Sequence, residues 1–253
     1  MRNYIKAELY RSFNRVYFWG MTVGLALTAL LFNALLLYMN YKWDQSISLA
    51  YLMEAGIMIL SAPYYLLIVF ADMITSEEQK NLTLKNVIGS GLSRSKMYLG
   101  KLIATFILAF ISAGIILGAY LGSGLVLFGL GDTFSMGLLQ DFSLRIVAAI
   151  PLWISGIALV TFLAMLIKNN TLFAMAYGFG VSFIPIVLHL LGNFVAEIFT
   201  VIYDYLPTTQ FKLLTEIDVL TSAQFMESVG AGIIHTLIFV VIGLIYTKRK
   251  TIH

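Results

Sequence analysis

The amino-acid sequence predicts an all-α integral membrane protein, with six transmembrane helices in a single domain that covers residues 1–253. Hydrophobic residues make up 60% of the chain and charged residues only 11%, whereas a soluble domain carries about 25% charged residues. Six apolar stretches are long enough for the ~20-residue helix that crosses the hydrocarbon core of a bilayer. None of them shows the alternating segments of about 10 residues that a transmembrane β-barrel requires. Lipid must therefore solvate most of this chain.

The first predicted element is an amphipathic helix over residues 1–16, which we expect to lie in the inner membrane interface. Its apolar positions recur at helical spacing and are Ile5, Leu9, Phe13 and Val16. Its polar positions point elsewhere, where basic side chains can meet anionic headgroups, and include Glu8, Arg11, Asn14 and Arg15. This elbow helix is either a topological anchor alone or also a contact for a cytoplasmic partner.

The six predicted spans cover residues 18–39, 55–73, 102–128, 145–167, 172–191 and 229–246. Their orientation follows from the basic residues, because Lys and Arg accumulate on the cytoplasmic side of membrane proteins. With the N-terminus inside, 13 of the 16 Lys and Arg residues fall on the inner side. The outer side keeps only Lys42, Arg145 and Lys212. Both chain termini are therefore predicted to be cytoplasmic.

The connection between the second and third spans, residues 75–101, is polar and basic. It is 27 residues long, although about 5 residues suffice to return a chain to the membrane. Ser76 and Gln79 have the spacing of a capping box, and Glu77 and Glu78 suit the first turn of a helix. We therefore expect a short cytoplasmic helix that contacts a partner. The alternative is a solvated basic loop that serves topology alone.

Groups that could carry chemistry are rare inside the spans. The polar residues in or beside the apolar stretches are Asn33, Asp72, His189 and His235. We interpret Asp72 and His189 as interfacial groups, and His235 as bonded to another helix. No acidic pair, metal-ligand set, nucleophile–base arrangement or phosphate loop is recognisable, and the chain contains no cysteine. We therefore expect no catalytic, cofactor-binding or metal site, and no enzymatic activity of this chain on its own.

Glycines and prolines interrupt several of the spans. Gly114 and Gly118 form a small-xxx-small pair that permits close approach of a second helix. Pro63, Pro151 and Pro185 each remove a backbone donor and are expected to bend the second, fourth and fifth spans. Such kinks suit a protein that changes shape, although Gly and Pro are also common in membrane helices that simply pack.

The outer segment before the last span, residues 192–228, is long for a connection. Within it, residues 193–206 are apolar-biased but too few to span comfortably, which fits a re-entrant or interfacial element. On one helical face of this element we expect an outer gate formed by Phe194, Ile198, Phe199 and Ile202. A simple extracellular loop packed on the bundle is the alternative.

The polar connection contains two short sequence motifs. Residues 78–86, EQKNLTLKN, resemble the E-x-x-N-G-T-L-K-N pattern of a known family, the permease subunits of type-2 ABC exporters. Residues 91–94, GLSR, and 98–101, YLGK, resemble the segment that follows it. Leu82 departs from the pattern, because the family commonly has Gly there. Six spans, an amphipathic elbow and a long outer segment are similar to the family's topology.

The resemblance implies a permease subunit in the plasma membrane of a bacterium. In that family a coupling helix of the first cytoplasmic loop fits a cleft of a separate ABC ATPase. Two permease chains pair, as a homodimer or a heterodimer, with two ATPase subunits that carry ATP and Mg²⁺. The residues that the resemblance assigns to ATPase coupling are Glu77, Glu78, Asn81, Thr83, Leu84, Lys85, Ser93 and Arg94.

The expected function is export of a hydrophobic or amphipathic substrate, because the spans are apolar, aromatic-rich and poor in charge. The resemblance points to peptide export and antimicrobial peptide resistance, since small relatives of this kind often move cytolytic peptides or protect against them. Two other classes stay open. A non-transporting immunity or scaffold protein would sequester a toxin. An ion-coupled secondary transporter is disfavoured, because the spans hold almost no embedded acids and show no repeat symmetry.

Overall fold

A computed structural model describes the chain over residues 1–43, 46–76, 89 and 91–249. Within these ranges the protein is all-α, with ten α-helices, one π-helical turn and no strand. Five helices are long and apolar enough to cross a membrane, and one bent pair of helices forms a sixth candidate span. The prediction of a helical multi-pass membrane protein is therefore confirmed.

The five continuous candidate spans extend beyond the apolar stretches that predicted them. They are α2 (Val16–Trp43), α7 (Arg94–Phe128), α8 (Met136–Leu166), α9 (Asn170–Phe194) and α12 (Ser222–Arg249). Residues 94–101 and 222–228, which we expected to be connections, already belong to α7 and α12. A helix that continues past the apolar core keeps its backbone hydrogen-bonded while charged side chains near its ends reach water.

The second predicted span is broken into two helices. α3 (Leu49–Met58) and the following α4 (Ala62–Ala71) meet at an angle of 67°. Pro63 stands in the first turn of α4, where the missing N–H would have no helical partner in any case. Pro63 therefore starts a helix instead of bending one, which corrects the expected kink. α4 continues into a π-helical turn, η1 (Asp72–Ser76).

Close packing of α8 against α12 depends on Gly232, which is not part of the small-xxx-small pair noted in the sequence. A Cβ atom on Gly232 of α12 would lie 2.5 Å from the Pro151 carbonyl carbon of α8. These two helices make the most extensive helix–helix contact of the described chain. A Cβ atom on Gly114 or Gly118 would meet nothing within 4 Å. The expected small-residue contact on α7 is therefore absent from the described part of this single chain.

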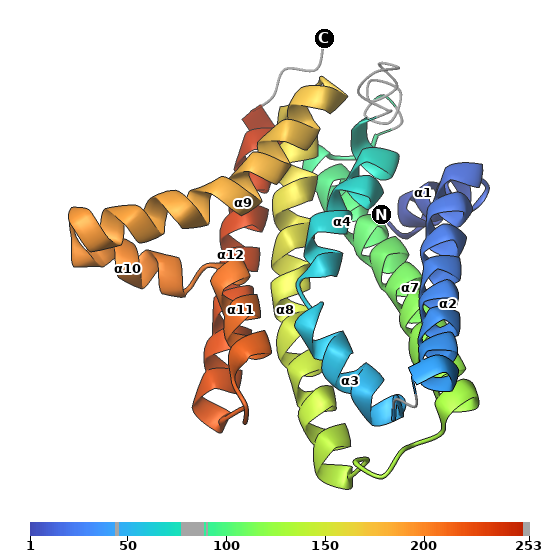
Figure 1. The fold of residues 1–253 in the computed structure, drawn as a ribbon. Coiled ribbons are helices and arrows are strands. Elements are labelled where there is room, and N and C mark those ends of the chain that lie inside the picture. The colour runs from blue at the N-terminus through green and yellow to red at the C-terminus, as the bar shows by residue number, and fades with distance from the viewer. Residues whose placement is uncertain (44–45, 77–88, 90, 250–253) are drawn as a thin grey trace.

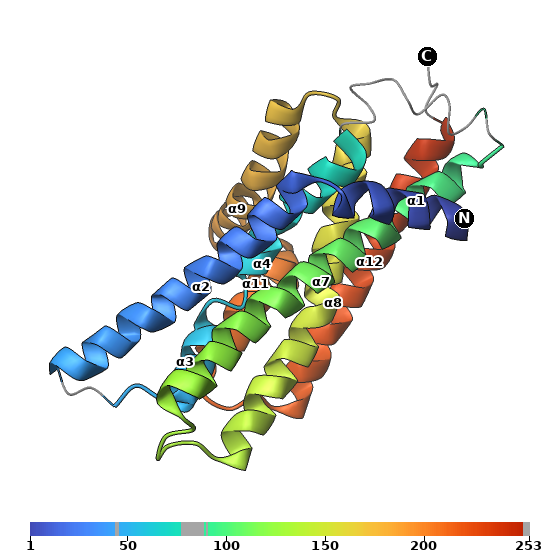
Figure 2. The ribbon, with the colours of Figure 1, turned by 90° about the vertical axis from the view of Figure 1, so that its right-hand side faces the viewer.

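The helices form an elongated bundle in which α2 packs along α7 and α8 packs along α12 (Figures 1 and 2). α4 contacts both α7 and α8. At one end of the bundle lie α1 (Arg2–Phe13), η1, the start of α7 and the end of α12 (Figure 2). The turn between α7 and α8 lies at the opposite end. The two ends of the polar connection are thus close to α1 and to the end of α12.

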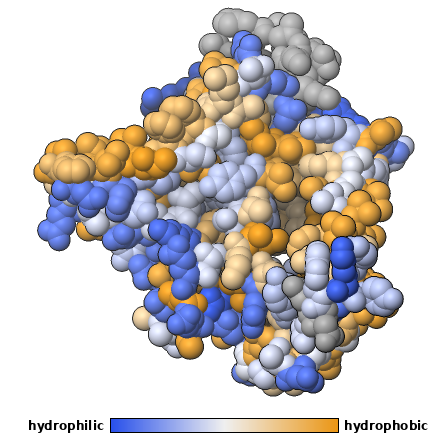
Figure 3. Space-filling model, viewed as in Figure 1, coloured by the Kyte–Doolittle hydropathy of each residue, from blue (hydrophilic) through white to orange (hydrophobic). Residues whose placement is uncertain are grey.

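The largest apolar core lies where α4, α7, α8 and α9 meet, and its fully buried side chains include Leu108, Leu152 and Phe173. The outer faces of α2, α9 and α12 are also apolar. Figure 3 shows this along α9, which projects away from the bundle in Figure 1. Helices that are apolar on their outer as well as their inner faces are typical of a bundle surrounded by lipid.

Two short helices connect α9 to α12. The first, α10 (Glu197–Asp204), runs back along α9, and Gly192 of α9 lies directly against Thr200 of α10. The second, α11 (Pro207–Glu216), contacts α8 and α12 more extensively than α9. Its Phe211 is fully buried, with its ring centroid 5.5 Å from that of Tyr64 in α4. The outer segment is therefore a helical structure packed on the bundle.

Candidate functional site

The candidate site consists of η1 together with α1 and the first turns of α7. We call it the inner junction, after the side of the membrane on which the sequence predicts these elements to lie. It holds both ends of the polar connection in which we expected the coupling helix. Of the predicted coupling residues, Ser93 and Arg94 lie at the start of α7. The others lie outside the described residues and stay predictions: Glu77, Glu78, Asn81, Thr83, Leu84 and Lys85. The capping pair of Ser76 and Gln79 is likewise untested.

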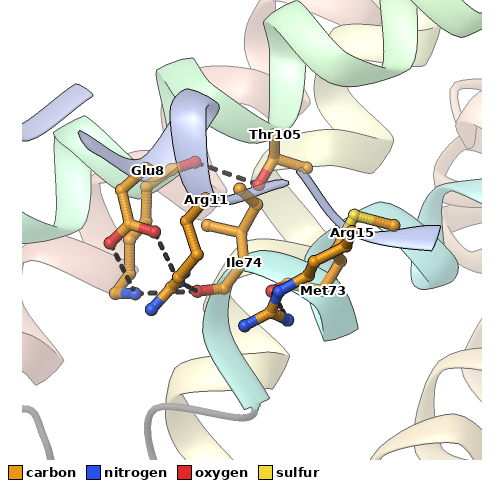
Figure 4. A network of polar contacts seen from close by, with 7 residues as sticks. Glu8, Arg11, Arg15, Met73, Ile74 and Thr105 are labelled. Atoms are coloured by element: carbon orange, nitrogen blue, oxygen red, sulfur yellow. Dashed lines mark hydrogen bonds and ion pairs between the residues drawn. The ribbon is translucent and has the colours of Figure 1, made fainter. Parts of the chain in front are cut away.

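Three cations meet the backbone carbonyls of η1 (Figure 4). Lys101 Nζ donates to the Ile74 carbonyl oxygen at 2.9 Å, and Arg11 donates to the same oxygen at 3.2 Å. Arg15 donates to the Met73 carbonyl oxygen at 3.4 Å. The last carbonyls of a helix lack intrahelical partners and form the negative end of its dipole. Cations from α1, from the link between α1 and α2, and from α7 therefore terminate the α4–η1 span at the point where the polar connection begins.

A buried carboxylate balances part of this charge. Glu8 of α1 is only 3% exposed and accepts hydrogen bonds from Arg11 and, at 3.5 Å, from Lys101 Nζ. Lys101 itself is fully buried. Charged groups leave water at a high free-energy cost unless they are paired and hydrogen-bonded. The pairing of Glu8 with Lys101 therefore fixes where α1 packs along α7.

The elbow helix forms as predicted, but its polar side is turned toward the protein. Glu8, Arg11, Ser12 and Arg15 follow the spacing of one helix face, and Glu8 and Ser12 are buried. Val16, which we had placed on the apolar face of this helix, begins α2 and is largely exposed. Arg11, and Arg15 just after the helix, bond to carbonyls of η1 while each keeps part of its surface exposed. Contact of these basic side chains with headgroups stays a prediction.

The other end of the connection is anchored to α12. The Arg94 guanidinium donates to the Lys248 carbonyl oxygen at 3.1 Å, near the C-terminal end of α12. Tyr98, fully buried one turn later, lies against Gly243, where a Cβ atom would lie 2.2 Å from the Tyr98 hydroxyl oxygen. Ser93 is exposed beside them. The start of α7 therefore packs directly against the end of α12.

The polar groups of the spans bond to a neighbouring helix or within their own helix. Asn33 is fully buried and donates from α2 to the Tyr120 carbonyl and the Ser123 hydroxyl of α7, both at 2.7 Å. His235 bonds to the Ala231 carbonyl of its own helix, not to another helix as expected. His189 contacts Asn193 and the ring of Tyr203. Asp72 lies in η1, where its Oδ1 atom has no hydrogen-bond partner within the described part of the chain.

The predicted outer-gate residues do not share one helix. Phe194 ends α9, and after a break at Val195 the other three lie on α10. Phe194, Ile198 and Ile202 are exposed, and Phe199 is half-buried. The residues buried in the bundle come instead from α11, including Gln210, whose side chain accepts a bond from Ser228 of α12. The structure does not test whether the α10 side chains act as a gate.

Sequence reasoning missed Lys101 and Arg145 as buried groups, because it placed Lys101 in the cytoplasmic connection and Arg145 on the outer side. Arg145 of α8 is 3% exposed and bonds to Asp141 and to carbonyls at the end of α11. The available signal was a cation directly beside an apolar stretch, because Lys101 precedes the stretch 102–128 and Arg145 begins the stretch 145–167. No group of three or more His, Cys, Asp or Glu residues in the described ranges could hold a metal ion.

Comparison with family models finds no match to this chain, and comparisons with curated proteins and with solved structures find none either. The length and hydropathy of its helices make the chain a multi-pass membrane protein. The structure also shows the inner junction, in which paired charges meet helix ends. This junction holds α1, η1 and the start of α7 in fixed relative positions.

Proposed function

We propose that this chain is the membrane-spanning permease subunit of an ATP-driven ABC exporter. A separate ATPase subunit supplies the energy and carries ATP and Mg²⁺, so this chain has no catalytic residue of its own. Residues 77–94 contact that ATPase. The substrate is hydrophobic or amphipathic, and a peptide fits it best. The protein acts in the plasma membrane of a bacterium, with both termini in the cytoplasm.

The observation that carries the proposal is the position of the motif segment between two anchors. The E-x-x-N-x-T-L-K-N residues at 78–86 follow η1, which Arg11, Arg15 and Lys101 hold to α1 and α7. The GLSR residues that follow lead into α7, which Arg94 joins to α12. Charged contacts thus hold both ends of this segment in position, which a segment that transmits force requires.

The anchors support a simple transmission mechanism. An ATPase that closes on nucleotide pushes on the segment between η1 and α7. The first anchor passes the displacement to α4 and α1, and the second passes it to α12, which packs along α8. Because packed helices resist compression, such a displacement moves whole helices instead of deforming them.

The distribution of buried charges supports a hydrophobic or amphipathic substrate. In the described ranges the buried charged side chains are Glu8, Lys101 and Arg145. Lys101 and Arg145 lie within the first three turns of long helices that begin at opposite ends of the bundle, and Glu8 pairs with Lys101. The central part of the spans is apolar and aromatic, with rings such as Tyr64 and Tyr177 stacked at 6.4 Å. Such surroundings favour an amphipathic molecule over a small ion.

The assembly in the proposal contains two permease chains and two ATPase subunits. The permease pair is a homodimer or a heterodimer, and the pathway lies between the two chains. A pair is favoured because one chain contributes at most six spans, and these pack around a side-chain core of their own. Lipid covers the remaining apolar faces of the bundle.

ATP-driven transport into inside-out vesicles tests the proposal. The vesicles contain this chain and, one at a time, the ABC ATPases of the same genome, with a fluorescent amphipathic cationic peptide as the probe. The proposal expects uptake that requires ATP, is blocked by vanadate and survives dissipation of ion gradients. Uptake that follows an ion gradient without ATP would instead identify a secondary transporter. Peptide that binds to the chain without entering the lumen would identify an immunity or scaffold protein.

A further inference from the structure

Lys101 is the most deeply buried cation of the inner junction. Its side chain has no exposed surface, although it lies within two turns of the start of α7. Its ammonium group reaches the Ile74 carbonyl oxygen of η1 at 2.9 Å and the Glu8 carboxylate of α1 at 3.5 Å. One side chain therefore connects three separate elements.

Separation of any of these elements would be costly. Withdrawal of Glu8 removes a counter-charge from a buried ammonium group, and withdrawal of Ile74 removes a charge-assisted hydrogen bond. Both costs arise in a low-dielectric environment, where water replaces the lost contact only if the junction opens. The ion pair thus favours joint movement of α1, η1 and the start of α7 over relative sliding.

Close packing at Gly100, next to Lys101, also holds α1 against α7. A Cβ atom on Gly100 would lie 2.7 Å from the ring of Tyr4, so α1 approaches the backbone of α7 closely there. Arg11 of α1, and Arg15 in the short link between α1 and α2, donate to carbonyls of η1. α1 is therefore fitted against both elements, and does not simply rest in the membrane interface.

We infer that Lys101 is a positioning residue that fixes α1 and η1 to α7, so that α1 moves with the two ends of the coupling segment as one body. The fixed position of α1 follows from the geometry alone. Its movement during transport rests on the proposed function. The elbow helix thereby becomes part of the transmission, in addition to anchoring the N-terminus.

The test measures the position of α1 relative to the rest of the bundle. Because the chain contains no cysteine, spin labels on Tyr10→Cys and Lys168→Cys report one distance between α1 and the turn joining α8 to α9. Both positions are exposed. The full chain is placed in nanodiscs of phosphatidylethanolamine and phosphatidylglycerol, and pulsed electron paramagnetic resonance gives the distance distribution.

The variants are Lys101→Met, Lys101→Arg and the matched control Lys96→Met, which removes an exposed lysine of the same helix. We expect a single narrow distribution in the parent, in Lys101→Arg and in the control. Lys101→Met should at least double its width, and backbone amides of η1 should exchange with deuterium more than about tenfold faster. An unchanged width in Lys101→Met would overturn the inference.

Two further measurements keep the test decisive. If Lys101→Met cannot be purified, Glu8→Gln removes the counter-charge and should broaden the distribution in the same way; a narrow distribution there would also overturn the inference. With the ATPase bound, ATP and vanadate should shift the mean distance in the parent and Lys101→Arg, but not in Lys101→Met. A broadened Lys101→Met without any shift in the parent would support the positioning role and contradict the proposed function.

Discussion

The Arg145 guanidinium of α8 donates a hydrogen bond to the Leu214 carbonyl oxygen of α11, 69 residues away in the sequence. The same group donates to the carbonyl oxygens of Ile217 at 2.9 Å and Asp218 at 3.0 Å, and to Asp141 at 2.6 Å. One buried cation therefore satisfies the unpaired carbonyls at the C-terminal end of a short helix. This contact fixes the outer segment to the bundle.

Replacement of Arg145 by Met should lower the free energy of unfolding by about 3–5 kcal/mol, because it leaves Asp141 and the α11 carbonyls without their donor. Denaturant unfolding in detergent measures the change. Lys212→Met is the matched control, since it breaks an ion pair on α11 whose members are both largely exposed. The control should change stability by no more than about 0.5 kcal/mol. Equal effects of the two changes would contradict the assigned role of Arg145.

Gly232→Ala should destabilise the protein by about 1–3 kcal/mol, because the added methyl group would overlap the backbone of α8 at Pro151. Gly230→Ala, two residues earlier in α12, has open space around its Cβ position. That control should be neutral or stabilising by up to about 1 kcal/mol, the usual gain of Ala over Gly in a helix. Thermal unfolding of the two purified variants checks the difference, and a stable Gly232→Ala would show that α8 and α12 pack less closely.

The double variant Phe199→Ser with Ile202→Ser should alter basal ATP hydrolysis or substrate release and leave assembly intact. Ile202 is exposed and Phe199 half-buried on α10, so the changes remove apolar surface without opening the core. Val126→Ser, which alters a largely exposed position of α7, is the control. Wild-type hydrolysis and release in the double variant would exclude α10 as an outer gate.

The spans could be predicted from the sequence because hydropathy over about 20 residues reports burial in lipid directly. The break in the second span could not. Its Leu60 carbonyl accepts a bond from Trp153 Nε1 at 3.3 Å, and this partner lies 93 residues further along the chain. The composition of 55–73 is equally compatible with one straight helix, so the break depends on tertiary contacts.

The burial of charges was also beyond sequence reasoning. Rules that assign Lys and Arg to one side of the membrane treat them as exposed, yet Lys101 and Arg145 are buried. Their partners, Glu8 and the end of α11, come from distant segments. The helical stripe of Glu8, Arg11 and Arg15 was visible in the sequence. That these side chains point toward the protein could not be predicted, because it depends on where η1 lies.

The central claim is that residues 77–94 couple this chain to a separate ATPase, and co-purification with that ATPase tests it most directly. We compare the parent, Glu78→Lys, Arg94→Glu and the control Lys96→Glu, which reverses an exposed charge of α7 on the same side. Loss of one partner of a desolvated interfacial charge pair costs ~2–5 kcal/mol, which weakens binding by more than about tenfold.

Native mass spectrometry of the purified complexes gives both stoichiometry and occupancy. The account predicts two permease chains with two ATPase subunits for the parent and Lys96→Glu, and loss of the ATPase from Glu78→Lys and Arg94→Glu while both variants remain folded. A stable, transport-active chain free of any ATPase, or full ATPase occupancy in both charge-reversed variants, would contradict it.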